Sequence, residues 1–65
     1  MQLYLNGEPR TVEATTVAEL VAALNLGGRR IAVERNERIV PRSKHADTVL
    51  EEHDRIEIVH AIGGG

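Results

Sequence analysis

Only one stretch of this 65-residue sequence carries apolar side chains at helical spacing, which limits the chain to a fold built around one main helix. Its apolar residues stand at positions i, i+3, i+4 and i+7, and such positions share one face of an α-helix. A helix with one apolar face must cover another element, and the rest of the sequence offers a sheet. The residues of this face are Val17, Leu20, Val21 and Leu24.

The ends of this helix are also marked. Thr16 and Glu19 have the spacing of a capping box, in which a hydroxyl and a carboxylate each accept a hydrogen bond from a backbone N–H at the helix start. Gly27-Gly28 tolerates the left-handed conformation with which helices commonly end. We therefore expect a helix of about three turns that begins at Val17.

Short runs of alternating apolar residues predict strands. A first hairpin is expected from residues 2–5 and 10–13, joined at Asn6-Gly7, a dipeptide that favours the positive φ angles of a tight turn. Val12 should point inward. Pro9 cannot donate to a ladder of hydrogen bonds, so the second strand should lie at a sheet edge.

A second hairpin and a final strand complete the sheet. The hairpin is expected from residues 30–35 and 39–41, interrupted at Asn36-Glu37. Residues 42–54 are mostly polar and predict a connecting loop with about one helical turn. Residues 55–61 are partly apolar on both faces, which favours a central strand.

The order hairpin, helix, hairpin, loop and strand is satisfied by two layers. We expect an α+β fold of the β-grasp type, in which one main helix packs across a mixed sheet of four to five strands. A chain of 65 residues is below the size at which proteins divide into domains. One domain over residues 1–61 is therefore expected, followed by a flexible glycine-rich C-terminal tail over residues 62–65.

Charge and hydropathy exclude several classes of partner. The ten acidic and eight basic residues are interspersed and give a formal net charge of -2. We expect no nucleic-acid partner, because no basic surface is formed. No apolar run approaches the ~20 residues of a membrane span, and residues 1–6 do not resemble a secretory signal. A cytoplasmic protein with no membrane partner is expected.

The sequence offers no metal site and no catalytic group. It has no cysteine, so it can form no thiolate metal site and supply no thiol nucleophile. His45, His53 and His60 are not spaced as metal ligands. Ser43 and Lys44 fit a solvated turn better than a catalytic triad. We therefore expect no bound metal or cofactor, no catalytic residue and no enzymatic activity of the chain itself.

The last residues have no role that the fold requires. Three glycines follow Ile62, and glycine neither packs a core nor favours a strand. A frayed terminus or an expression remnant would explain them, but no serine-rich spacer or tag accompanies them. In a functional interpretation, Ile62, Gly63 and Gly64 thread a narrow channel of a partner enzyme over ~13 Å. The carboxylate of Gly65 would then reach the partner's active site.

A carboxylate delivered in this way can be activated with ATP. Attack of its oxygen on the α-phosphate would give an acyl adenylate, with magnesium and cationic groups supplied by the partner. A sulfur nucleophile on another protein would displace AMP, and reduction would leave a thiocarboxylate. Gly65 is the expected site of both modifications.

Two segments resemble those of a known family. Residues 33–43 contain an Asn turn followed by Ile-Val-Pro-Arg, and residues 54–59 lead into Ala61-Ile62-Gly63-Gly64-Gly65. Together with the chain length, they resemble the ThiS family, the sulfur carrier proteins of thiamine biosynthesis. The resemblance implies a ubiquitin-like β-grasp fold. It also implies a terminal glycine that is adenylated by an E1-like enzyme, converted to a thiocarboxylate and presented to thiazole synthase.

The sequence leaves related functions and the sulfur donor open. A β-grasp sulfur carrier for molybdopterin synthesis would share the tail chemistry, and a ubiquitin-like protein modifier would join its glycine to a lysine amine. The short chain and the Ile-Val-Pro-Arg run favour the thiamine carrier. Its sulfur donor could be a desulfurase persulfide or another sulfur relay.

The sheet face that the helix does not cover is the expected docking surface for partners. Alternation along the last strand places Val59 and Ala61 on that face, beside the tail. The alternative is that Val59 lies under a loop.

Overall fold

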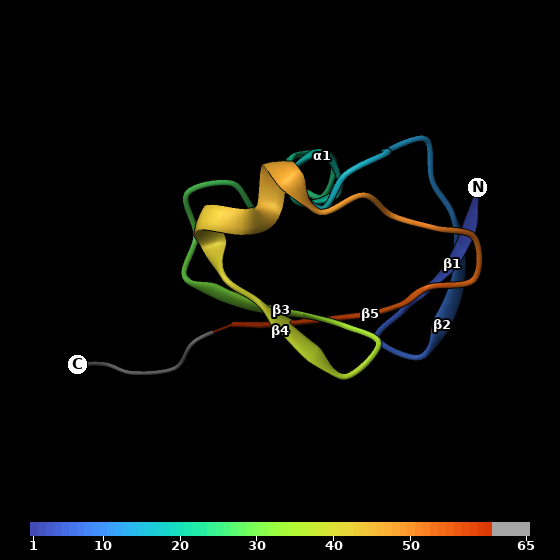
Figure 1. Cartoon of the computed structure of the whole chain (residues 1–65). Coiled ribbons are helices and arrows are strands. Elements are labelled where there is room, and N and C mark those ends of the chain that lie inside the picture. Colours follow the sequence, from blue (N-terminus) through green and yellow to red (C-terminus); the bar gives the residue numbers. More distant parts are fainter. Residues whose placement is uncertain (61–65) are drawn as a thin grey trace.

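The computed structural model describes residues 1–60, which form a five-stranded mixed sheet with α1 and η1 on one side of it (Figure 1). The elements in chain order are β1 (Gln2–Leu5), β2 (Glu8–Thr11), α1 (Val17–Ala23), β3 (Ile31–Arg35), β4 (Arg38–Val40), the 3-10 helix η1 (Arg42–Asp47) and β5 (Arg55–His60). The α+β class, with one main helix across one mixed sheet, is confirmed. Within residues 1–60, no helix is long and apolar enough to cross a membrane.

The last strand lies at the centre of the sheet, as its two apolar faces predicted. The strand order is β2-β1-β5-β3-β4. β5 runs parallel to β1 and antiparallel to β3. The strand that carries Pro9, β2, is an edge strand as expected.

The first hairpin has a tighter connection than predicted. Leu5 pairs directly with Glu8, so the loop contains only Asn6 and Gly7. Their φ angles are 50° and 85°, and a type I′ turn requires positive values at both positions. The return strand therefore begins and ends earlier than predicted, and Val12 lies beyond its end, partly buried against the core.

α1 begins at Val17 as predicted, but only half of the capping box forms. Thr16 Oγ1 accepts a hydrogen bond from the Glu19 N–H at 3.1 Å. Glu19 Oε1 turns instead to Thr15, accepting from its backbone N–H at 2.7 Å and from its hydroxyl at 2.9 Å. These bonds hold the pKa of the Glu19 carboxyl below its ordinary value.

The helix is shorter than predicted because it ends before the glycines. α1 has seven residues, about two turns. Asn25 has a φ of 61°, its N–H donates to Ala22 O, and the Leu26 N–H donates to Val21 O. This pair of bonds is a Schellman motif. The expectation that Gly27-Gly28 would end the helix was wrong, because an asparagine takes the left-handed position first.

The core between the sheet and the helices is wholly aliphatic. The long connection contributes Leu50, which is 2% exposed and whose N–H donates to Thr15 O at 2.9 Å. The predicted helical turn in this connection is present as η1, which packs against α1. The buried apolar residues are Leu3, Leu5, Val17, Leu20, Val21, Val33, Leu50, Ile56 and Ile58.

The two hairpin turns share a conformation but differ in their second residue. In the second hairpin Arg35 pairs with Arg38, and Asn36 and Glu37 have φ angles of 52° and 71°. Glu37 thus occupies the position that Gly7 holds in the first hairpin. A residue with a Cβ pays about 1 to 2 kcal/mol for the left-handed conformation.

We predict that Glu37→Gly raises the free energy of unfolding by about 1 kcal/mol, because glycine adopts this conformation without strain. Urea denaturation measures the change. The matched control is Gly7→Ala, which should lower stability by a similar amount through its φ of 85° alone, since no atom lies within 4 Å of an added Cβ. Equal stability of Glu37→Gly and the wild type would contradict the assignment of strain to this turn.

Candidate functional site

Only one of the predicted site residues lies among the described residues 1–60. Val59 lies on β5. Ala61, Ile62, Gly63, Gly64 and Gly65 lie outside the described residues. The structure therefore describes the strand that leads to the reactive end and the surface beside that strand.

On its β3 side, β5 is paired from Ile56 to His60. The register runs from the pair Arg35 and Ile56 to the pair Ile31 and His60. Asn36 extends this pairing past the end of β3. Its backbone N–H donates to Arg55 O at 2.8 Å, and its Oδ1 accepts from the Arg55 N–H at 2.9 Å.

On its β1 side, β5 pairs with only two residues, and the side chain of Asn6 continues the ladder. The paired residues of β1 are Tyr4 and Leu5. The Asn6 N–H donates to Ile56 O at 2.8 Å. Asn6 Oδ1 accepts from the Ile58 N–H at 2.9 Å, and Asn6 Nδ2 donates to Ile58 O at 3.3 Å. One turn residue thus replaces a further strand residue beside β5.

A buried carboxylate fixes the start of β5. Asp54 is 5% exposed. Its Oδ2 accepts from Arg35 Nε at 2.6 Å and from the Glu51 N–H at 2.8 Å, and its Oδ1 accepts from Asn36 Nδ2 at 3.0 Å. The Tyr4 N–H donates to Asp54 O at 2.8 Å. The residue before β5 is therefore tied to β1, to β3 and to the second turn.

The electrostatics of this network favour the ionised carboxylate. Burial opposes the charge on Asp54, but the hydrogen bonds from Arg35, Asn36 and the Glu51 N–H outweigh it and hold the pKa of Asp54 below its ordinary value. The hydrogen bond to Asp54 in turn raises the pKa of Arg35. The Arg35 side chain is partly buried because its guanidinium pairs with this buried carboxylate.

The residues that hold β5 were not predicted from the sequence. Two of them left a signal, because an asparagine opens each hairpin turn, Asn6 in the first and Asn36 in the second. Asparagine tolerates positive φ, and it also carries an amide that can bond a neighbouring strand. Asp54 left no such signal, since its partner Arg35 lies nineteen positions away in the chain.

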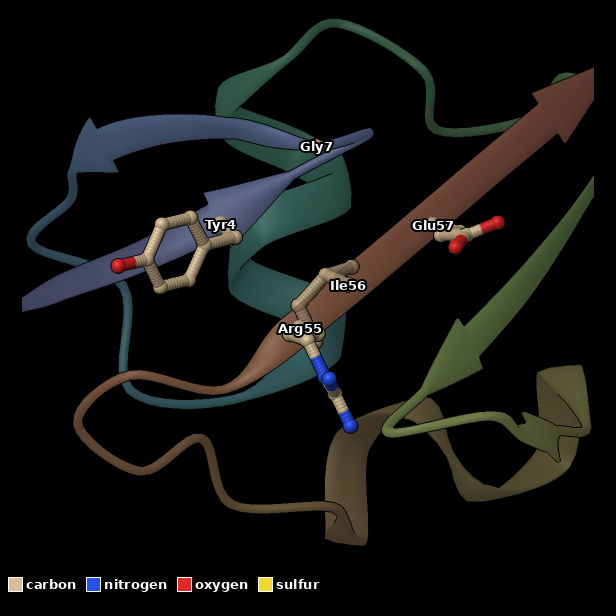
Figure 2. A pocket seen from close by; sticks show the side chains of 5 residues that line it. All are labelled: Tyr4, Gly7, Arg55, Ile56 and Glu57. Atoms are coloured by element: carbon tan, nitrogen blue, oxygen red, sulfur yellow. The ribbon is translucent and has the colours of Figure 1, made fainter.

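The face of the sheet opposite α1 is open beside β5. Val59 is 57% exposed, so the alternative that a loop covers it is excluded for the described residues. Tyr4, Arg55 and Glu57 also lie on this face, with α1 behind the sheet (Figure 2). Ala32 pairs directly with Val59 across the strands and is exposed as well.

The histidines lie apart from one another. His45 is buried in η1, with Nε2 3.2 Å from Val40 O. His53 is exposed in a turn with a φ of 70°, and His60 is exposed at the end of β5. Among the described residues, no three His, Cys, Asp or Glu side chains are grouped as a metal site would need.

Comparison with known proteins gives a consistent family match. The model of the ThiS family matches residues 3–65. A sulfur carrier protein ThiS from Bacillus subtilis is 38% identical over 97% of this chain and 98% of its own length. The crystal structure of a thiamine biosynthesis protein (ThiS) from Geobacter metallireducens superposes with a TM-score of 0.86, at 32% identity and full coverage of both chains.

The chain is also similar to part of a larger protein. A thiazole synthase from Magnetococcus marinus is 47% identical over the whole of this chain, which spans 20% of the synthase. A second thiazole synthase, from Paramagnetospirillum magneticum, is 46% identical over the same share. A unit like this one therefore occurs within the same polypeptide as that enzyme.

We predict that Asn6→Gly lowers the free energy of unfolding by about 1 to 2 kcal/mol, because it keeps the turn but removes the two side-chain bonds to Ile58. Hydrogen exchange at the Ile58 amide should become faster than at β3 amides. Asn25→Gly is the matched control, since Asn25 also has a positive φ and no side-chain hydrogen bond is present for it among the described residues. A loss of stability no larger than that of the control would contradict the role of the Asn6 amide.

We predict that Asp54→Asn lowers the free energy of unfolding at neutral pH by about 2 kcal/mol. In the variant, this free energy should also fall less steeply as the pH is lowered. Because the pKa of Asp54 is lower in the folded than in the unfolded chain, where it is about 3.9, its contribution is present above pH ~4 and is lost as the pH falls through the folded value. Urea denaturation from neutral to acid pH measures both effects. Part of the acid dependence should remain, because the pKa of Glu19 is also lowered.

The control for this pair of effects is Asp47→Asn, which alters an exposed aspartate at the end of η1. It should change neither the stability nor its pH dependence. An Asp54→Asn variant with the wild-type acid profile would refute the account of this network.

Proposed function

The chain belongs to the ThiS family, and we propose that it is a sulfur carrier protein for the formation of the thiazole moiety of thiamine. The family match through Gly65 carries this proposal. It is supported by the fold, which superposes over its full length on a thiamine biosynthesis protein. The similarity to a sulfur carrier protein along nearly the whole of both chains adds to it.

The proposed chemistry begins at the carboxylate of Gly65. Its oxygen attacks the α-phosphorus of ATP in an E1-like adenylating enzyme, a bond between carboxylate oxygen and phosphorus forms, and pyrophosphate leaves. Magnesium and cationic groups of the enzyme stabilise the charge that develops on the phosphate. The chain itself contributes only the carboxylate, so ATP and magnesium are cofactors of the partner.

The second stage replaces oxygen by sulfur. The terminal sulfur of a protein persulfide, supplied by a desulfurase or another sulfur relay, attacks the acyl carbon and AMP leaves. A dithiol then reduces the resulting acyl disulfide, which splits the S–S bond and leaves a thiocarboxylate on Gly65. The thiocarboxylate is delivered to thiazole synthase, a partner suggested by the relatives in which a similar unit is part of that enzyme.

In this proposal the folded residues hold the tail in position. The chain acts as a protein co-substrate and is not itself an enzyme. Pairing with β3 as far as His60 holds the end of β5, the strand that leads to the tail. Ile62, Gly63 and Gly64 then enter the partner's active site, while Val59 and Ala61 contribute to docking. We place the chain in the cytoplasm, where ATP is available to the adenylating enzyme.

The test is conversion of the purified chain with its adenylating enzyme, ATP, magnesium and a persulfide donor. Intact-mass spectrometry should show an exchange of one oxygen for sulfur, located at Gly65 by fragmentation. Deleting Gly65 should abolish this conversion, because the remaining carboxylate falls short of the reacting atoms. The deletion should leave the melting temperature unchanged, since the body of the fold is intact.

Two results would contradict the proposal. One is a wild-type chain that gains no sulfur, or whose Gly65 is found in peptide linkage to further residues in protein taken from its host. The other is the formation of lysine conjugates in place of a thiocarboxylate, which would indicate a protein modifier.

A further inference from the structure

The open face of the sheet holds two glutamates directly opposite each other. Glu34 on β3 pairs with Glu57 on β5, and directly opposed side chains have their Cβ atoms about 5 Å apart. Like charges in this arrangement destabilise a sheet. Among residues 1–60, neither carboxylate forms a hydrogen bond or an ion pair. The pair therefore has no close ion-pair partner among these residues, although Arg55 lies diagonal to Glu34 and two positions before Glu57 on the same face.

Exposed apolar side chains lie around this pair, and a partner protein could bury them. Ile39 lies opposite Glu34 on β4 and is 71% exposed. Val59 follows Glu57 on the same face and is also mostly exposed. Apolar side chains thus flank the glutamates on two sides, and the side of Val59 is the one from which the chain continues towards Gly65.

On its other side the pair borders a shallow hollow. The hollow has a volume of about 390 Å³ and is lined by Tyr4, Gly7, Arg55, Ile56 and Glu57. The side chains of Arg55 and Glu57 extend in different directions from β5 (Figure 2). Among the described residues, Arg55 forms no ion pair with Glu57.

This arrangement fits an arginine of a partner protein. A guanidinium has several N–H donors in a fixed planar fork and can bond two carboxylates at once. Its aliphatic stem can lie along exposed apolar side chains while the charged head reaches the acids. Two carboxylates on a flat surface fall short of the six or more oxygen ligands that calcium requires.

We propose that Glu34 and Glu57 together receive an arginine of thiazole synthase when the open face docks on that enzyme. The inference rests on the proposed function. We choose thiazole synthase as the partner because this chain is 47% and 46% identical to units that are part of thiazole synthases. Its identity to the separate sulfur carriers of Bacillus subtilis and Thermus thermophilus is 38% and 32%. A costly charge pair that has no partner within the described chain is expected at a functional surface.

The test is the affinity of the unmodified chain for thiazole synthase of the same organism, measured by titration calorimetry at low and high salt. The double variant Glu34→Gln/Glu57→Gln should bind at least ~10-fold more weakly at low salt, and the difference should shrink at high salt as charges are screened. The matched control, Glu8→Gln/Glu13→Gln, makes the same change in net charge at exposed positions away from this face. It should bind within about twofold of the wild type.

A second readout separates recognition from a structural role. The Glu34→Gln/Glu57→Gln variant should melt at the same temperature as the wild type or higher, because a repulsion is removed. Wild-type affinity in this variant, an equal loss in the control, or no binding by the wild type would each overturn the inference. The proposed function is tested separately by thiocarboxylate formation at Gly65, so either can fail without the other.

Discussion

The rest of the structure depends on how β5 is held, which is by a small aliphatic core and by pairing with strands on both of its sides. β5 contributes Ile56 and Ile58 to that core. Its pairing with β1 is limited to two residues, and the amide of Asn6 extends it. On the other side, the side-chain amide of Asn36 extends the pairing of β5 beyond the end of β3. Both turns are thus part of the support of β5 as well as connections between strands.

This support leaves one face of the sheet available. α1 and η1 lie on the same side (Figure 1), so the buried side chains of the sheet all point one way. The opposite face carries Val59, the glutamate pair and the hollow beside Tyr4. Because β5 belongs to both the core and this face, a partner that docks there lies next to the strand that continues into the tail.

Features that depend on neighbouring residues could be predicted from the sequence. The Asn6-Gly7 turn, the start of α1 and the central position of β5 follow from turn chemistry, capping and hydrophobic alternation. The end of α1 was mispredicted because Asn25 and Gly27 can both take the left-handed conformation, and bonding to the last helical carbonyls decides between them. The Asp54 network could not be predicted, since it joins residues that only the finished sheet brings together.

Amide hydrogen exchange of the free chain tests most directly whether β5 is held as described. The account predicts that the amides of Arg55 and Ile58, which are bonded to the two asparagine side chains, exchange only through global unfolding, with the free energy found by denaturation. Exchange at these amides as fast as at the exposed edge of β2 would contradict it. β5 would then open locally, and the fold could not fix the point from which the tail departs.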